Sequence, residues 1–440
     1  MSYTPHTPDD IARMLGRIGV SSVGDLFDSV PESLRSRGEL KLARPLAEQA
    51  LLGYLGELAG RNASCERTAS FLGGGAYHHF IPATVDALAS RGEFLTAYTP
   101  YQAEVSQGTL QAIFEFQTLM CQLTGLEVAN ASLYDGASAT AESALLALRT
   151  TKRRRVLLGA GVHPHYAQVL RTYLEGIGAE IQELPIGPDG RTELAEVPAD
   201  TACIVLQQPN FFGCVEQLAP FARAAQAAGA LLVSTTAEPL ALALVQPPGA
   251  EGADVACGEA QSFGVPLSFG GPYAGFLTTR QKFVRQLPGR LIGESVDSQG
   301  ERAFVMTLTT REQHIRREKA TSNICTNQGL MALRVTIWLA LHGKQGLREL
   351  AESNLALAHY ARAKLREVGL ELPYSAPVFN EFVVAGRGLT ARAAKVDPTE
   401  MLPGLSLERI DPRRRDQLLI CTTEMNTRAE IDRLAEVLAP

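Results

Sequence analysis

Two polar loops, far apart in the sequence, carry the residue types best suited to chemistry. The first lies in "FLTAYTPYQAEVSQG" (residues 94–108), where Tyr98, Tyr101 and Gln102 stand just ahead of a long amphipathic helical pattern. Phenol hydroxyls and side-chain amides in that position suit the mouth of a ligand site or an interface between chains. A tightly packed loop explains the same residues equally well, so spacing alone leaves the choice open.

The second loop follows a run of basic residues. In "REQHIRREKATSNICTNQ" (residues 311–328), arginines, a lysine and His314 precede Thr321, Ser322 and Asn323. Such a stretch can hold an anionic group, with Arg317 and Lys319 close by in sequence. A short charge run more often marks a solvated helix end, so this choice also stays open.

Two further stretches raise the question of a phosphate site. In "SLYDGASATAESALLALR" (residues 132–149) a strand end runs through Gly136 into a helix expected to start near Ser138, and a helix start can hold phosphate with its free N–H groups. Ser138 or Thr140 capping the helix explains the same pattern, and Glu142 in the first turn favours the cap. The glycine triplet of "FLGGGAYHHFIP" (residues 71–82) lacks the strand and helix of a dinucleotide fingerprint, so we expect a structural turn.

The pair His163 and His165 in "GVHPHY" (residues 161–166) invites a metal site. Residues two apart on a helix do not face each other, and no third ligand lies nearby in the sequence. No metal site is therefore predicted.

Composition excludes several classes of partner. The 440 residues carry a formal net charge of −6 and a pI of about 5.9, so no basic field is offered to nucleic acid or to an anionic membrane. The N-terminal "MSYTPHTPDD" does not read as a secretion signal, and no apolar stretch is long enough to span a bilayer. Seven scattered cysteines without a Cys-x-x-Cys pair fit a reducing compartment, so we expect a cytoplasmic protein.

The elements that must position these loops form an α/β pattern. From Arg154 onward, apolar strand patterns such as "RVLLG", "TACIVLQQ" and "ALLVSTT" alternate with helical ones, which predicts a parallel sheet covered on both faces. We expect a helical N-terminal arm over residues 1–70, a large domain over 71–330 and a small C-terminal α/β domain over 331–440. In the closing helix, Thr427 and Glu430 predict a capping box, followed by one apolar stripe.

Four motifs in this order carry a family resemblance: "YTPYQAEVSQG", "YDGASATAE", "FGVPLSFGGPYAGF" and "REKATSNICTNQ". They closely resemble glycine dehydrogenase (decarboxylating), the P-protein family of the glycine cleavage system, and more narrowly the shorter first subunit of its two-chain bacterial form. The resemblance implies a fold-type I transferase-like architecture that depends on pyridoxal phosphate, with a large domain, a mostly parallel sheet of the seven-stranded type and a smaller C-terminal domain. It also implies an oxidoreductase of glycine catabolism that decarboxylates glycine and transfers the aminomethyl group to the lipoyl arm of the H-protein, with the cofactor as electron sink.

This chain departs from an active member at two positions. None of its seven lysines lies between the "ADVACGEA" strand and "FGGP", where the cofactor lysine is expected, and Lys282 in "TTRQKF" comes only after the next strand. The strand "ALLVSTTAEP" has Thr235 and Thr236, with Glu238 just beyond, where an aspartate would face the pyridine nitrogen. The resemblance therefore implies that pyridoxal 5'-phosphate is bound covalently by the partner, subunit 2, and not by this chain.

Fold-type I active sites lie between protomers, which implies a role for a chain that lacks the lysine. Tyr98, Tyr101 and Gln102 are the candidates for a catalytic contribution across the interface, and Thr321, Ser322 and Asn323 for contacts with the partner's cofactor. The expected partners are subunit 2, in an α2β2 heterotetramer, the lipoylated H-protein and glycine. Two other functions stay open: a self-sufficient pyridoxal phosphate lyase or aminotransferase with an unorthodox lysine, and a non-catalytic docking scaffold.

Overall fold

The computed structural model describes residues 5–35, 41–95 and 99–440 of the chain. Contacts divide it into two units, residues 1–62 and 63–440. The first unit holds helices α1 (Pro8–Ile18) and α2 (Glu48–Ala59). Thr7 and Asp10 form a capping box at the start of α1, and neither helix has a buried residue. The sequence-based boundaries at residues 70 and 330 stay predictions.

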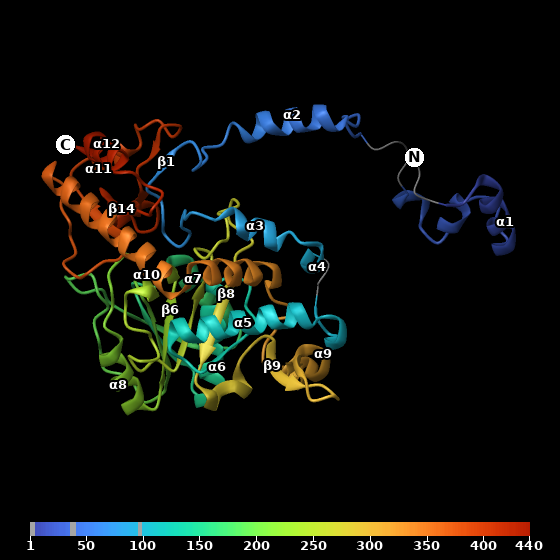
Figure 1. The fold of residues 1–440 in the computed structure, drawn as a ribbon, viewed down its shortest axis with the longest axis horizontal. Coiled ribbons are helices and arrows are strands. Elements are labelled where there is room, and N and C mark those ends of the chain that lie inside the picture. The colour runs from blue at the N-terminus through green and yellow to red at the C-terminus, as the bar shows by residue number, and fades with distance from the viewer. Residues whose placement is uncertain (1–4, 36–40, 96–98) are drawn as a thin grey trace. The chain divides into compact units, whose positions relative to one another are not determined.

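A seven-stranded sheet forms the centre of the second unit (Figure 1). Its strand order is β2-β8-β7-β6-β5-β3-β4, in which β3 to β7 are parallel, β8 runs antiparallel to β7, and β2, which pairs antiparallel with β8, again has the direction of β3 to β7. The strands are β2 (Val128–Ala129), β3 (Arg155–Gly159), β4 (Glu180–Leu184), β5 (Thr201–Gln207), β6 (Leu231–Thr236), β7 (Val255–Glu259) and β8 (Gly275–Thr279). The predicted α/β fold with a mostly parallel sheet is confirmed.

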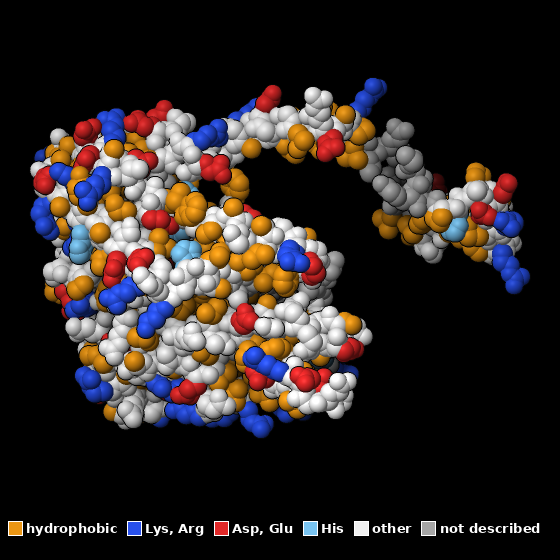
Figure 2. Space-filling model, in the orientation of Figure 1, with side chains coloured by type: hydrophobic (Ala, Val, Ile, Leu, Met, Phe, Trp, Pro, Cys, Tyr) orange, Lys and Arg blue, Asp and Glu red, His pale blue; other side chains and the backbone are white. Residues whose placement is uncertain are grey.

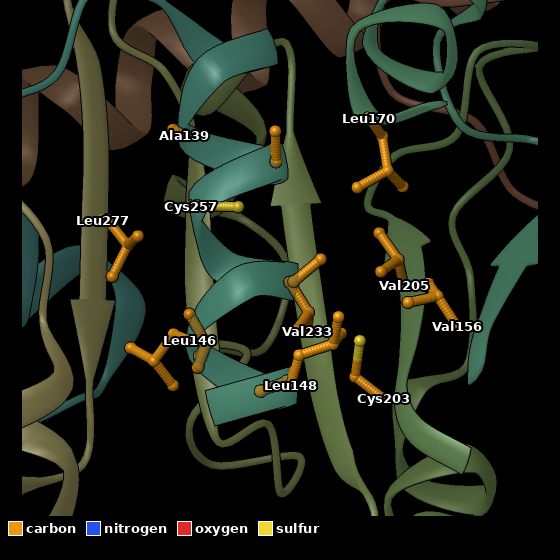
Figure 3. Close-up of a cluster of buried hydrophobic side chains, with 14 of the residues drawn as sticks. Ala139, Leu146, Leu148, Val156, Leu170, Cys203, Val205, Val233, Cys257 and Leu277 are labelled. Atoms are coloured by element: carbon orange, nitrogen blue, oxygen red, sulfur yellow. The ribbon is translucent and has the colours of Figure 1, made fainter. Parts of the chain in front are cut away.

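Helices cover both faces because the central strands are apolar on both. On one face, α6 (Gly136–Thr151) and α7 (Pro164–Glu175) pack on alternate residues of the strands, among them Val156, Val205, Val233 and Leu277 (Figure 3). On the other face, α8 (Leu218–Ala228) packs on Leu157, Ile204 and Leu232, the neighbours in sequence that point the opposite way. This two-sided burial explains why β5, β6 and β7 read as continuous apolar runs.

Long helices link the sheet to the C-terminal part of the unit. Helix α5 (Gln107–Thr124) and the first half of α10 (Gly329–Glu367) share a buried cluster with Phe263 and Phe276. Helix α10 breaks at Gly343, whose φ of 59° is accessible to glycine, and its second half packs on the C-terminal sheet. That antiparallel sheet has the order β11-β14-β13, formed by β11 (Glu381–Ala385), β14 (Gln417–Cys421) and β13 (Leu405–Ser406).

Three smaller elements complete the frame of the candidate site. The hairpin of β9 (Leu291–Val296) and β10 (Arg302–Thr307) packs beside α5, and β1 (Ala69–Ser70) pairs with β12 (Met401–Leu402). Helix α12 (Arg428–Leu438) begins at the capping box predicted from the sequence, formed by Thr427 and Glu430. The predicted apolar stripe is buried: Ile431, Leu434, Ala435 and Leu438.

Candidate functional site

The carboxyl ends of the parallel strands meet at one edge of the sheet, which is where α/β proteins bind ligands. Strand β6 ends there in Thr235 and Thr236, both buried. The Oγ1 atom of Thr235 lies 2.8 Å from that of Thr140 on α6. The last two residues of β6 thus carry hydroxyls, of which that of Thr235 is already bonded inside the chain, and neither carries a carboxylate to face a pyridine nitrogen.

The turn after β7, residues 260–274, contains no lysine. Ser262 and Phe263 are buried in it. Lys282 lies on an exposed 3-10 turn (Gln281–Gln286), as expected from the sequence, and its Nζ atom is 3.5 Å from Asp254. Because Asp254 precedes the first residue of β7, Lys282 lies at the opposite edge of the sheet.

The start of α6 uses its own carboxylates to satisfy the free N–H groups. Asp135 is the cap and accepts from the Ser138 N–H at 2.7 Å, so the helix begins two residues earlier than expected and Ser138 is not the cap. The Gly136 N–H donates to Glu259 at 3.0 Å. Burial raises the pKa of Glu259 to about 7, although three backbone N–H groups donate to its carboxylate and by themselves lower the pKa. A phosphate would meet two carboxyl groups here, and a Cβ atom at Gly136 would already collide with the Tyr166 hydroxyl.

The glycine triplet lies at the same edge of the sheet, next to the start of α7. His163, at the start of α7, contacts Gly74 through an Nε2 to carbonyl hydrogen bond of 2.6 Å, while its Nδ1 accepts from the His165 N–H. Burial lowers the pKa of His163 to about 4, so the ring is neutral. Its centroid lies 4.9 Å from that of Tyr166 and 5.1 Å from that of Phe211. The triplet is therefore a close-packed turn, as expected.

A buried polar cluster lies beside this turn, and we call it the sheet-edge network: Tyr77, His79, Glu238, Glu381 and Glu424. His79 lies between two carboxylates, 3.0 Å from Glu238 and 2.9 Å from Glu424. Burial alone would lower the pKa of His79, but the two carboxylates outweigh it and raise the pKa to about 10. Burial raises the pKa of Glu424, but the bond to His79 dominates and lowers it to about 2.

The space left at this edge is small. A cavity of about 10 Å³, lined by residues that include Tyr77, Asn210 and Glu381, has room for one water molecule. The Tyr77 hydroxyl donates to Glu381 at 2.6 Å, and burial raises the pKa of Glu381 to about 7. With no lysine, no aspartate and no free helix start, these residues do not fit pyridoxal phosphate.

The two candidate loops meet elsewhere, at the end of the β9–β10 hairpin. Tyr98 lies outside the described residues. Tyr101 is 57% exposed and Gln102 is exposed too, at the start of a short 3-10 turn. Arg290, just before β9, is 5% exposed and extends toward the Tyr101 hydroxyl at 3.5 Å.

The residues predicted in the second loop have different surroundings. Ser322 donates to Glu142 on α6 at 2.7 Å, and burial raises the pKa of Glu142. The Thr321 N–H donates to the Arg311 carbonyl, and the exposed Asn323 accepts from Gln313 at 3.1 Å. Ser322 thus anchors the loop to α6 and Thr321 anchors it to the turn at Arg311, while Asn323 is exposed.

Sequence analysis missed the charged residues that organise both regions. Arg290 follows a proline and a glycine in "LPGRLIG", and a lone arginine at the head of an apolar strand is the signal that points to it. His79, Glu238 and Glu424 lie far apart in the chain and come together only through the fold. Within the described ranges there is no group of three or more potential metal ligands and no helix able to cross a membrane.

An apolar groove lies beside the Tyr101 loop. Its volume is about 380 Å³, and it runs along α5 and α10 near α3 (Ala83–Ala89) and α4 (Gly92–Leu95), where hydrophobic side chains gather on the face shown in Figure 2. The apolar lining consists of Leu88, Phe94, Ala112, Leu333, Ile337 and Leu341, among others. A smaller adjoining cavity reaches Pro100 and Asn327, so the groove continues into the two candidate loops.

Comparison with known proteins gives a consistent family. A family model described as the glycine cleavage system P-protein matches residues 1–438. A relative from Thermomicrobium roseum, named probable glycine dehydrogenase (decarboxylating) subunit 1, is 51% identical over 445 residues, covering 100% of this chain and 99% of the relative. A relative of the same name from Geobacillus kaustophilus is 47% identical over 441 residues, covering 99% of this chain and 98% of the relative.

Solved structures agree with these matches. An inhibitor-bound glycine decarboxylase (P-protein) of the glycine cleavage system is 47% identical, with a TM-score of 0.88 and coverage of 100% of this chain and 99% of the other. A sphingosine-1-phosphate lyase from Burkholderia pseudomallei is 15% identical with a TM-score of 0.64, over 92% of this chain and 93% of the other. The second likeness shows the fold alone.

Proposed function

The chain belongs to the glycine cleavage system P-protein family, and from this premise we propose that it is the subunit of glycine dehydrogenase (decarboxylating) that carries no cofactor. Together with subunit 2 it decarboxylates glycine and transfers the aminomethyl group to the lipoyl arm of the H-protein. One observation carries the proposal: the sheet edge that would hold pyridoxal phosphate is filled by the chain's own Tyr166, His163 and Glu259.

The partner chain holds pyridoxal phosphate, which supplies the electron sink for decarboxylation when it is bound. This chain contributes polar groups to the partner's site. These groups are the hydroxyl of the exposed Tyr101 and the amides of the exposed Gln102 and Asn323. The predicted contribution of Tyr98 belongs to the same set. Thr321 and Ser322 hold the second loop in place beside them.

The apolar groove along α5 and α10 supports a pairing surface next to these loops. A groove with a mainly apolar lining and a polar rim is typical of a surface that another chain covers. It adjoins Pro100 and Asn327, so a subunit seated on it would bring its own site to Tyr101. An α2β2 assembly of two such pairs is the expected working form.

The experiment compares each chain alone with the mixed pair. Exchange of labelled carbon dioxide into glycine should be absent with this chain alone and full with the pair. Pyridoxal phosphate and borohydride should leave no stable adduct on the isolated chain, and the pair should carry one cofactor for two chains. An adduct on one of the seven lysines, at unit stoichiometry, would make this chain catalytic in its own right. Full activity of subunit 2 alone would reduce it to a docking scaffold.

A further inference from the structure

Arg290 joins the two candidate loops at one buried guanidinium. Its NH1 group donates to the Thr326 hydroxyl at 3.1 Å and to the Asn327 side chain at 3.3 Å. Its NH2 group donates to the Cys325 carbonyl at 2.9 Å and reaches the Tyr101 hydroxyl at 3.5 Å. The guanidinium carbon also lies 5.7 Å from the centre of the Tyr101 ring, within the range of a cation–π contact.

A buried guanidinium must be compensated, because an unpaired charge away from water is costly. The nearest carboxylate belongs to Glu312, but its Oε2 atom is 3.9 Å from Arg290 Nε, too far for a hydrogen bond. Neither Arg290 Nε nor Glu312 Oε1 has a hydrogen-bond partner among the described residues. Glu312 thus supplies charge balance, while the hydrogen bonds of Arg290 go to the loops.

Each loop also has anchors of its own. The Cys325 N–H donates to the Tyr134 hydroxyl at 3.1 Å, and Asn327 donates to Ser132 at 3.1 Å. Tyr101 bonds through its N–H to the Thr99 carbonyl, which fixes the backbone but not the phenol. The Tyr101 ring lies edge-on to His314, with the ring centroids 6.1 Å apart, and Arg290 is the residue that contacts the phenol hydroxyl.

We propose that Arg290 is a positioning residue for the glycine reaction. Its planar fork holds the Tyr101 phenol and the segment 325–327 in one arrangement, which is the surface presented to the partner's site. The expected effect of Arg290 on activity rests on the proposed function. The arrangement itself can be tested in this chain without any reaction.

The conservative variant Arg290→Lys keeps the charge but replaces a fork of five donors with a single ammonium group. In the assembled pair we expect kcat for glycine decarboxylation to fall by about tenfold with KM for glycine nearly unchanged, since an interaction made in the transition state is lost. In a Tyr101→Phe background the same change should cost less activity than in the wild type, because one of the two elements that Arg290 holds is already missing. Additive losses in the double variant would overturn the proposal.

Hydrogen exchange of the full chain by itself gives the readout that needs no activity. Arg290→Lys should speed exchange in residues 99–106 and 321–328 and leave the sheet unchanged. The control is Arg153→Lys, whose guanidinium bonds only to the carbonyls of Thr201 and Ala228 at the other edge of the sheet. Unchanged rates in both loops, or faster exchange everywhere, would overturn the proposal. If the wild-type pair does not decarboxylate glycine, the proposed function fails, and the exchange data still decide the role of Arg290.

Discussion

The sheet-edge network and the Arg290 loop junction (Tyr101, Arg290, Glu312 and residues 325–327) each contain one buried cation, His79 and Arg290, but the partners of the two cations differ. In the network, the His79 imidazolium has a carboxylate on each side at about hydrogen-bond distance. At the junction, the guanidinium is bonded to loop atoms, and Tyr101 is 57% exposed. The network is closed within the chain, whereas the junction presents its polar groups outward.

This difference separates a stabilising role from a functional one. Charges that are fully paired inside one chain can hold a fold together but have nothing left to offer a ligand. Through His79, the network joins Glu238, just after β6 of the large sheet, to Glu424, just after β14 of the C-terminal sheet. The junction keeps the Tyr101 side chain exposed, which the proposed contribution to another chain's site requires.

The largest expected effect comes from breaking the network at its cation. His79→Gln leaves Glu238 and Glu424 buried and facing each other without a positive charge, which should lower the free energy of unfolding by about 3–5 kcal/mol. Urea unfolding of the isolated chain at pH 7 measures this. The matched control is His163→Gln, at a buried histidine that is neutral, where the loss of up to two hydrogen bonds of the ring should cost about 1–2 kcal/mol. Equal losses in both variants would contradict the charged state of His79.

At the junction the expected effect is on rate and not on stability. Tyr101→Phe removes an exposed hydroxyl, so the free energy of unfolding should change by less than about 0.5 kcal/mol. Glycine decarboxylation by the assembled pair should fall by about tenfold, corresponding to about 1.4 kcal/mol of lost transition-state stabilisation. Asn323→Ala tests the second loop in the same assay. Wild-type rates in both variants would mean that the loops have only a packing role, and would support a docking scaffold.

The network, unlike the junction, predicts that the free energy of unfolding depends on pH. The pKa of His79 rises from about 6.5 in the unfolded chain to about 10 in the folded one, so its stabilising contribution is complete below pH 6.5 and is lost as pH rises toward 10. The free energy of unfolding should fall by up to about 1.4 kcal/mol per pH unit between pH 8 and 9, above the range in which Glu259 and Glu381 titrate. His79→Gln should remove that slope. A slope that survives the substitution would assign the titration to another group.

Sequence patterns predicted the features that depend on residues close together in the chain. The capping box of Thr427 and Glu430 and the alternation of strands with helices are set within a few residues, and both are confirmed. The sequence predicts a start of α6 near Ser138, with Ser138 or Thr140 as the capping residue, but the helix begins two residues earlier and Asp135 is the cap. The contacts of His79 with Glu238 and Glu424, and of Arg290 with the two loops, join residues far apart in the chain. No local pattern encodes them, because only the packed sheet brings them within bonding distance.

The smallest expected effect, close to zero, belongs to Lys282, the first lysine after the position where the cofactor lysine is expected. It pairs at 3.5 Å with Asp254 on the surface, and an exposed pair of this kind contributes about 0–1 kcal/mol. Five residues of β7 separate Asp254 from the edge that holds the closed network, a distance of about 16 Å at the usual rise of a strand. Lys282→Met should therefore leave the stability, the cofactor content of the pair and the rate of decarboxylation unchanged. Loss of cofactor or of activity in this variant would mean that Lys282 binds the cofactor despite its position, and the sheet edge would then have to open in the assembled enzyme.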